Sequence, residues 1–223
     1  MIKLIAFDLD DTLYNEKEFV FGAFREVAEY LANKYNLNSE RLYEDMIDIL
    51  RKEGRGKIFN LICQNYNINE DIKALVQVYR NSKPKLKLYD DSLKVLNQLK
   101  ENYKLGLITD GLASVQWNKI KLLDLEKYFD NIIVTDDLGR EYWKPHILAF
   151  KNMAEKFDFS PDECVYIGDN PNKDFLGARE IGYKTIRITR EEGDHIKVRL
   201  DKEYEGDYDI SSLNELISIV ESI

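Results

Sequence analysis

Short runs of apolar residues occur once at the start of the chain and repeatedly in its second half. The first run is Leu4-Ile5-Ala6-Phe7, which shows no alternation of apolar and polar side chains. Unbroken apolar runs of this length are typical of parallel strands that are buried on both faces. Similar runs span residues 105–109, 131–135, 164–168 and 183–188. The pattern therefore predicts five buried strands.

Apolar residues at helical spacing separate these predicted strands. The helical positions are Leu93, Leu96 and Leu99; Ile120 and Leu123; Leu148, Phe150, Met153 and Phe157; and Phe175, Ala178 and Ile181. Strands that alternate with helices form a parallel sheet with helices on both faces. The predicted fold class is α/β. A further short strand near residues 208–210 and a helix from Ser212 are expected after the charged stretch from Glu191 to Asp209.

The stretch between the first and second predicted strands contains only helical pattern. Phe19, Ala23, Val27 and Leu31 recur every four residues and share one face of a helix. Apolar groups within residues 42–50, 58–62 and 72–79 indicate three more helices, with the break between the first two of these at residues 54–56. We therefore expect a core built from residues 1–14 and 85–223, and an inserted all-helical unit at residues 15–84.

Composition narrows the classes of function. The formal net charge is −9, which disfavours a general binder of nucleic acid or of anionic membranes. No segment approaches the roughly 18 apolar residues that span a bilayer, and no signal peptide is evident, so a cytoplasmic location is expected. The two cysteines are far apart and the chain has two histidines, which argues against a disulfide framework and a zinc site. Nothing in the sequence indicates an oligomeric state.

Acidic residues follow the predicted strands at their carboxyl ends. Asp8 and Asp10 come after the first strand, Asp110 after the second, and Asp169 and Asp174 after the fourth. In open α/β sheets these strand ends face the ligand crevice. Two carboxylates about 4 Å apart repel by roughly 4 kcal/mol at an effective dielectric of about 20. Several of them in one crevice would therefore protonate or bind a divalent cation, and oxygen ligands without Cys or His select a hard ion such as Mg²⁺.

Four residues at or after the ends of the second and third strands have phosphate-binding chemistry. The hydroxyl of Thr109 and the backbone N–H groups of Asp110 and Gly111 could hold phosphate oxygens at the start of a helix. Lys144, in the loop after the third strand, could neutralise a phosphate or a carboxylate. Of the paired acids Asp8 and Asp10, one could serve as a nucleophile and the other as a proton donor and acceptor.

Together these motifs resemble those of a known family. Asp8-Leu9-Asp10-Asp11-Thr12, Thr109, Lys144-Pro145 and Gly168-Asp169 with Asp174 occur in the order of the four motifs of the haloacid dehalogenase-like (HAD) superfamily. The resemblance covers about residues 1–14 and 85–205. It implies a Rossmann-like core with strand order 5-4-1-2-3, and the helical insert resembles the C1-type cap of the phosphatase subgroup.

The resemblance also implies roles for individual residues. Asp8 is the nucleophile that forms an aspartyl-phosphate, and Asp10 is the general acid and base. Phosphoryl oxygens are held by Thr109 and by the backbone of Asp110 and Gly111, while Lys144 offsets the charge on phosphate and Asp8. The resemblance implies a Mg²⁺ ion bound by Asp8, the backbone carbonyl of Asp10, and Asp169, with Asp174 supporting the site from behind. The side chain of Asp110 is expected to be replaceable.

The expected activity is a Mg²⁺-dependent phosphatase of a small phosphorylated metabolite, either a nucleoside monophosphate or a sugar phosphate. Dehalogenases of the family lack an aspartate two residues after the nucleophile, so Asp10 argues for phosphoryl transfer. A phosphomutase of the β-phosphoglucomutase type keeps both aspartates and remains an alternative, as does a non-catalytic binding protein on the same fold. In the helical insert, the turn formed by residues 53–57 is a candidate for contact with substrate.

Overall fold

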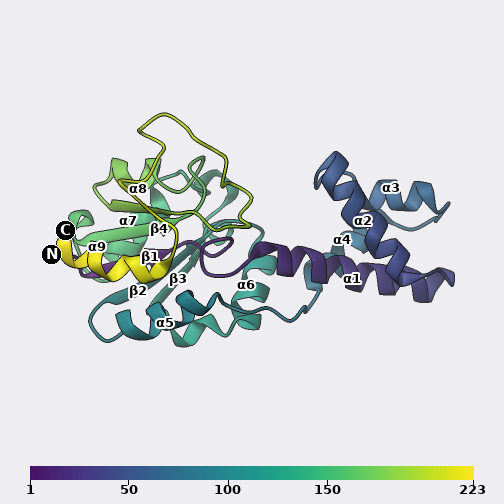
Figure 1. Ribbon diagram of the computed structural model, residues 1–223, viewed down its shortest axis with the longest axis horizontal. Helices are drawn as coiled ribbons and strands as arrows, with labels where there is room; N and C mark the ends of the chain where they lie inside the picture. The colour runs from purple at the N-terminus through teal and green to yellow at the C-terminus, as the bar shows by residue number, and fades with distance from the viewer. The chain divides into compact units, whose positions relative to one another are not determined.

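The structure is a computed structural model that describes residues 1–223. It divides the chain into two compact units, shown with their element labels in Figure 1. The sheet unit consists of residues 1–16 and 87–223, and the helical unit consists of residues 17–86. The sequence places these boundaries at 14/15 and 84/85.

The sheet unit contains one six-stranded sheet in which every pair of neighbouring strands is parallel. The strands are β1 (Leu4–Phe7), β2 (Lys104–Thr109), β3 (Asn131–Val134), β4 (Cys164–Gly168), β5 (Lys184–Ile188) and β6 (Tyr208–Ile210). Their order is β3-β2-β1-β4-β5-β6. This confirms the expected order 5-4-1-2-3, with β6 added beside β5. Leu4 is paired with Lys104 on one side and Cys164 on the other, so β1 is central.

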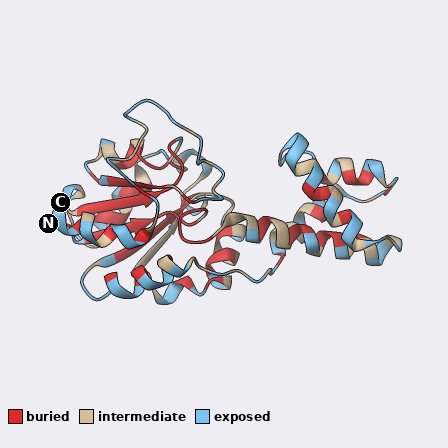
Figure 2. Cartoon of the chain, in the orientation of Figure 1, coloured by how far each residue is buried: buried red, intermediate tan, exposed pale blue.

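Helices cover both faces of this sheet. They are α5 (Asp90–Leu99), α6 (Ala113–Leu122), α7 (Leu148–Glu155), α8 (Leu176–Glu180) and α9 (Leu216–Ser222). In Figure 1, α7 and α8 lie over one face and α5 and α6 over the other. Leu4 and Ala6 belong to one buried cluster with Phe150 and Met153 of α7. Figure 2 shows the central strands buried, because both faces are covered, and this is why their sequences are apolar without alternation.

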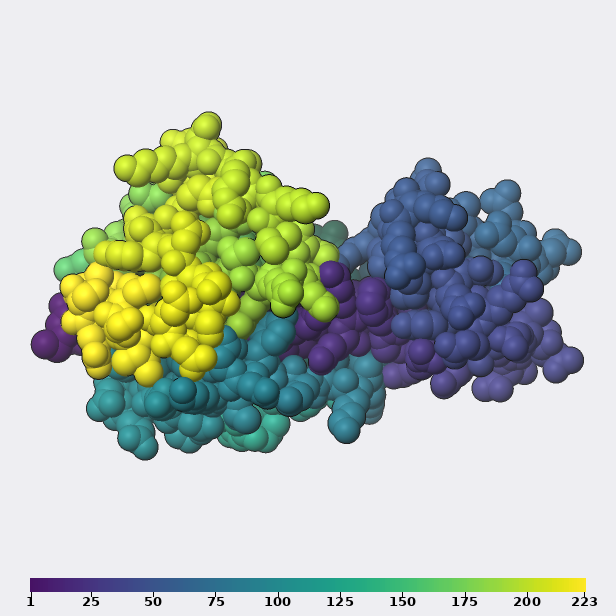
Figure 3. Space-filling view, viewed as in Figure 1, coloured from purple at the N-terminus to yellow at the C-terminus, as the bar shows by residue number.

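The charged segment between β5 and β6 lies on the surface of the sheet unit, where Figure 3 shows it in yellow-green. The buried guanidinium of Arg187 anchors it. Arg187 donates hydrogen bonds to the backbone oxygens of His195 and Val198, and it forms an ion pair with Glu205. One buried side chain on β5 therefore holds a long polar loop that shows no periodic pattern in the sequence.

The helical unit contains the four helices expected from the sequence. They are α1 (Glu16–Tyr35, whose first residue belongs to the sheet unit), α2 (Ser39–Glu53), α3 (Ile58–Asn65) and α4 (Ile72–Asn81). The side chain of Asn38 caps α2 and that of Asp71 caps α4. Gly54 ends α2 with φ 73°, a conformation that favours glycine. The unit has its own hydrophobic core, which includes Val27 and Leu31. None of the helices in the chain is long and apolar enough to cross a membrane.

Candidate active site

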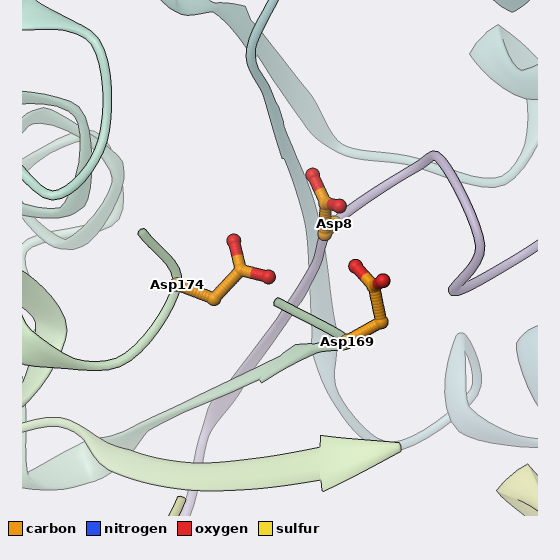
Figure 4. Close-up of side chains that lie close together, drawn as sticks. All are labelled: Asp8, Asp169 and Asp174. Carbon is orange, nitrogen blue, oxygen red and sulfur yellow. The ribbon is translucent and has the colours of Figure 1, made fainter. Parts of the chain in front are cut away.

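The candidate site lies at the carboxyl ends of the central strands. Asp8 follows β1 directly, and its N–H donates to the carbonyl of Ile167 on β4 at 2.8 Å. Asp169 follows β4 in the same way, and Asp174 lies in the turn after it. Figure 4 shows the three carboxylates directed toward one another. One oxygen from each lies within 4.8 Å of the others, and all three side chains are buried.

Lys144 connects two of these carboxylates. Its Nζ lies 2.7 Å from Asp8 Oδ1 and 2.7 Å from Asp174 Oδ1, and it also donates to the hydroxyl of Tyr166 at 2.7 Å. The lysine side chain has no exposed surface. Burial alone would lower its pKa, but the charges of Asp174 and Asp8 outweigh burial and hold the pKa of Lys144 above its ordinary value. Lys144 is therefore a fixed, charged counter-ion of Asp8.

The second oxygen of Asp8 has no hydrogen-bond partner. Asp8 Oδ2 is buried and accepts no hydrogen bond. Burial raises the pKa of Asp8 to about 6, although the positive charges of Lys144 and Lys173 oppose this shift. Buried carboxylate oxygens normally have a donor or a cation beside them. An orphaned oxygen at the tip of a central strand is the feature expected of a nucleophile or of a metal ligand.

Asp169 and Asp174 differ in their electrostatic surroundings. Burial, with the neighbouring negative charges of Asp174 and Asp8, raises the pKa of Asp169 well above its ordinary value. Burial also acts on Asp174, but the charges of Lys144 and Lys173 outweigh it and lower the pKa of that carboxyl. Lys173 opposes the shift at Asp169 but does not outweigh it, whereas Lys144 and Lys173 together outweigh burial at Asp174.

The two oxygens of Asp174 are both engaged. Oδ1 accepts from Lys144, and Oδ2 accepts from the backbone N–H of Asn170 at 2.9 Å. Gly168 makes room for this carboxylate, because a Cβ at that position would lie 2.5 Å from Asp174 Oδ2. The oxygens of the cluster that remain for a ligand are therefore Oδ2 of Asp8 and those of Asp169. An all-oxygen donor set, with a buried oxygen that accepts no hydrogen bond and a carboxylate whose charge is not offset, fits a hard divalent cation.

Asp10 has a different set of neighbours. Its carboxylate accepts from Tyr14 OH at 2.7 Å, from Gln116 Nε2 at 3.0 Å, and from Lys119 Nζ at 2.8 and 2.9 Å. Burial opposes ionisation, but the charge of Lys119 and the hydrogen bonds from Lys119, Tyr14 and Gln116 together lower the pKa of Asp10. Asp10 is therefore an ionised carboxylate with both oxygens hydrogen-bonded.

The residues at the carboxyl end of β2 form hydrogen bonds with α6, with the end of β3 and with the loop that carries Lys144. Thr109 Oγ1 lies 2.5 Å from Gln116 Nε2. Asp110 Oδ1 accepts from the hydroxyl of Thr135 at 2.6 Å and from the backbone N–H of Lys144 at 3.1 Å. Gly111 has φ 132°, in the range that favours glycine. The side chain of Asp110 therefore ties the loop that carries Lys144 to the end of β2, a contact that the sequence did not suggest.

Sequence reasoning missed five side chains that contact the aspartates: Tyr14, Gln116, Lys119, Tyr166 and Lys173. Gln116 and Lys119 are one helical turn apart on α6 and are both buried. Gln116 and Lys119 are three residues apart in the helix that follows Thr109, a spacing that puts them on one helix face. This spacing was the available signal in the sequence. Tyr166 and Lys173 carried no signal, since a tyrosine inside a strand and a lysine in a turn usually have other roles.

The chain is similar to known proteins in both sequence and fold. A model of the family described as haloacid dehalogenase-like hydrolase matches residues 5–188. A protein named glyceraldehyde 3-phosphate phosphatase from Methanocaldococcus jannaschii is 36% identical, and the match covers 100% of this chain and 99% of the relative. A protein named pyrophosphatase PpaX from Bacillus mycoides is 27% identical, covering 100% and 98%. The solved structure of a HAD phosphatase from Thermococcus onnurineus matches with a TM-score of 0.65 and 27% identity, covering 98% of both chains.

Proposed function

The chain belongs to the haloacid dehalogenase-like hydrolase family, and from this membership and the geometry of its site we propose a Mg²⁺-dependent phosphatase of a small sugar phosphate. Relatives that match it over their whole length are named as phosphatases, which makes it a phosphoric monoester hydrolase. Glyceraldehyde 3-phosphate is the first substrate to test, and pyrophosphate is the second. The observation that carries the proposal is the buried Asp8, which accepts a hydrogen bond from Lys144 on one oxygen and no hydrogen bond on the other.

We assign Asp8 as the nucleophile. Its oxygen forms a bond to phosphorus while the bond from phosphorus to the substrate oxygen breaks, which leaves an aspartyl-phosphate. Water then attacks the same phosphorus, the bond to Asp8 breaks, and inorganic phosphate leaves. Lys144 stabilises the negative charge near Asp8 in both steps, and it needs no reorganisation because Asp174 and Tyr166 already hold it.

We assign Asp10 as the proton-transfer group. Its carboxyl gives a proton to the leaving oxygen in the first step and takes one from the attacking water in the second. In the arrangement described here Asp10 is ionised and bound by Lys119, so it is ready to accept a proton. Donation requires the carboxylate to be protonated first and its contact with Lys119 to loosen.

Thr109 and the backbone N–H groups of Asp110 and Gly111 would hold the phosphoryl oxygens. Asp8, the backbone carbonyl of Asp10, and Asp169 would hold Mg²⁺. When bound, such a cation would offset the repulsion between a phosphate dianion and the carboxylates. We also propose that the helical unit acts as a C1-type cap that selects the substrate. The exposed turn formed by residues 53–57 is its candidate contact.

The test is a screen for release of inorganic phosphate from the purified protein with Mg²⁺ present. The panel contains glyceraldehyde 3-phosphate, hexose phosphates, nucleoside monophosphates, pyrophosphate and p-nitrophenyl phosphate. We expect turnover of a sugar phosphate that stops when EDTA removes the metal and returns when Mg²⁺ is added in excess.

Each part of the proposal has a result that would contradict it. Conversion of a sugar phosphate into an isomer without phosphate release would establish the mutase alternative. Absence of turnover across the whole panel would favour a binding protein on this fold. Full activity after exhaustive chelation would remove the role of the metal while leaving Asp8 in place.

A further inference from the structure

The ammonium of Lys173 lies beside the unpartnered oxygen of Asp8. Lys173 Nζ is 4.0 Å from Asp8 Oδ2, a distance that permits charge attraction but exceeds a hydrogen bond. Lys144 approaches the same carboxylate from Oδ1 at 2.7 Å. Two lysines therefore flank Asp8, one on each oxygen, and only the first is hydrogen-bonded to it.

The two lysines differ in how many hydrogen bonds their ammonium groups already donate. Lys144 has no exposed side-chain surface, and its ammonium is shared among Asp8, Asp174 and Tyr166. The side chain of Lys173 is 25% exposed. Its backbone N–H donates to the carbonyl of Asn170 within the turn after β4. An ammonium has three donors, and the long contact with Asp8 leaves those of Lys173 available to a ligand.

The charge in this region also calls for a second cation when phosphate is present. Asp8, Asp169 and Asp174 carry three carboxylates within one small cluster. A phosphate group that approaches Asp8 Oδ2 adds negative charge on the side of the carboxylate where Lys173 lies. The 4.0 Å separation places the Lys173 ammonium within reach of a group bound at this oxygen.

We propose that Lys173 is a second phosphate-binding residue of this site, which donates to an oxygen of the phosphoryl group held at Asp8 Oδ2. The inference rests on the proposed phosphatase function, because it assumes that phosphate occupies this position. It assigns the two lysines separate tasks: Lys144 orients the nucleophile, and Lys173 binds the group that is attacked. Inorganic phosphate, the product of hydrolysis, is bound by the same contact.

The experiment measures binding of inorganic phosphate by isothermal titration calorimetry in buffer with Mg²⁺. It compares the natural protein with Lys173→Met, Lys173→Arg and the control Lys156→Met, which removes an exposed lysine outside the site. Loss of one charge-assisted hydrogen bond predicts about tenfold weaker phosphate binding for Lys173→Met. Binding by Lys173→Arg should stay within about threefold of the natural protein, and Lys156→Met should not differ from it.

A titration of Mg²⁺ without phosphate, run on the same four proteins, tests the competing explanation. The alternative is that Lys173 serves only as a counter-ion of the carboxylates when no metal is bound. Lys173→Met would then bind Mg²⁺ more tightly and would bind phosphate as well as the natural protein does, and the proposal would be wrong. Equal losses for the Met and Arg variants, with lowered melting temperatures, would also overturn it. Because no turnover is measured, a protein that binds phosphate through Lys173 but hydrolyses no ester would refute only the proposed function.

Discussion

The surroundings of Asp8 and Asp10 differ sharply although only one residue separates them in the chain. One oxygen of Asp8 accepts a hydrogen bond from Lys144 and the other accepts none, and burial raises the pKa of Asp8 to about 6. Asp10 has four hydrogen-bond contacts, from Tyr14, Gln116 and Lys119, and its pKa is lowered. The same side chain is thus left reactive at one position and fully paired at the other.

The difference comes from the elements that supply the neighbours. Asp8 contacts Lys144 from the loop before α7. It also lies close to Asp169 and Asp174, which follow the carboxyl end of β4. Asp10 meets α6, which contributes an amide and an ammonium on one face. Two carboxylates whose pKa values are shifted in opposite directions are typical of sites that divide nucleophilic and proton-transfer roles. The surroundings of the two carboxylates, rather than their residue type, therefore distinguish the proposed nucleophile from the proposed proton-transfer group.

The largest effect is expected from Asp8→Asn. The amide cannot attack phosphorus, so we expect turnover of any substrate to fall by about 10⁴-fold or more. The fold should persist, because Asn has nearly the same shape and Lys144 keeps Asp174 as a partner. Phosphate release measures the first effect, and circular dichroism with thermal unfolding measures the second.

The matched control for this variant is Asp201→Asn, which makes the same change at an exposed aspartate in the loop between β5 and β6. It should turn over substrate like the natural protein. If Asp8→Asn were nearly as active as this control, Asp8 would not be the nucleophile. The different surroundings of Asp8 and Asp10 would then not reflect different catalytic roles.

An intermediate effect that depends on the leaving group is expected from Asp10→Asn. General acid–base catalysis contributes about 10²–10⁴-fold, so steady-state turnover should fall by that factor. With an alkyl phosphate, both steps lose their proton-transfer group. With p-nitrophenyl phosphate the leaving group needs no proton, so the first step should still proceed and the aspartyl-phosphate should accumulate.

Stopped-flow measurement of p-nitrophenolate distinguishes these outcomes. We expect a rapid burst that approaches one product per active site, followed by slow turnover. Equal slowing of the burst and of the steady state would mean that Asp10 positions the phosphate rather than transferring protons. Asp8 and Asp10 would then differ in position but not in the division between nucleophilic and proton-transfer roles.

The smallest effect concerns Asp91, a carboxylate of the sheet unit whose pKa is lowered like that of Asp10 but which lies outside the candidate site. Asp91 Oδ2 accepts from Arg190 Nη1 at 2.7 Å, and from Ser212 Oγ and the backbone N–H of Leu213 at 2.9 Å each. Burial opposes ionisation, but Arg190 and the other donors lower the pKa of Asp91 below its ordinary 3.8. Asp91→Asn should leave turnover unchanged and lower the free energy of unfolding by about 1 kcal/mol near neutral pH, after allowance for solvent screening.

The sign of the pH dependence follows from the lowered pKa. The stabilisation is fully present above the unfolded-state value of 3.8 and is lost as the pH falls through the folded-state value below it. The difference in melting temperature between the natural protein and Asp91→Asn should therefore be constant above about pH 5 and shrink in stronger acid. A difference that grows in acid would show that this pair stabilises the fold by some other means.

The sequence alone determined the architecture and the outline of the chemistry. The apolar runs predicted five parallel strands because a strand covered on both faces must be apolar throughout, and the helical periodicity between them predicted the insert at residues 15–84. The motif residues Asp8, Asp169 and Asp174 were predicted to meet, since the carboxyl ends of parallel strands lie at one edge of a sheet. These features depend on local pattern and on the topology that it specifies.

Only the tertiary structure decided which oxygen of each carboxylate is paired and with what. Lys119 and Lys173 appear in the sequence as ordinary charged residues of a helix and a turn, and Asp110 appears replaceable. Their contacts depend on side-chain directions and on the packing of elements far apart in the chain, which no local pattern encodes. For the same reason the opposite pKa shifts of Asp8 and Asp10 arise only when burial and neighbouring charges are set in three dimensions.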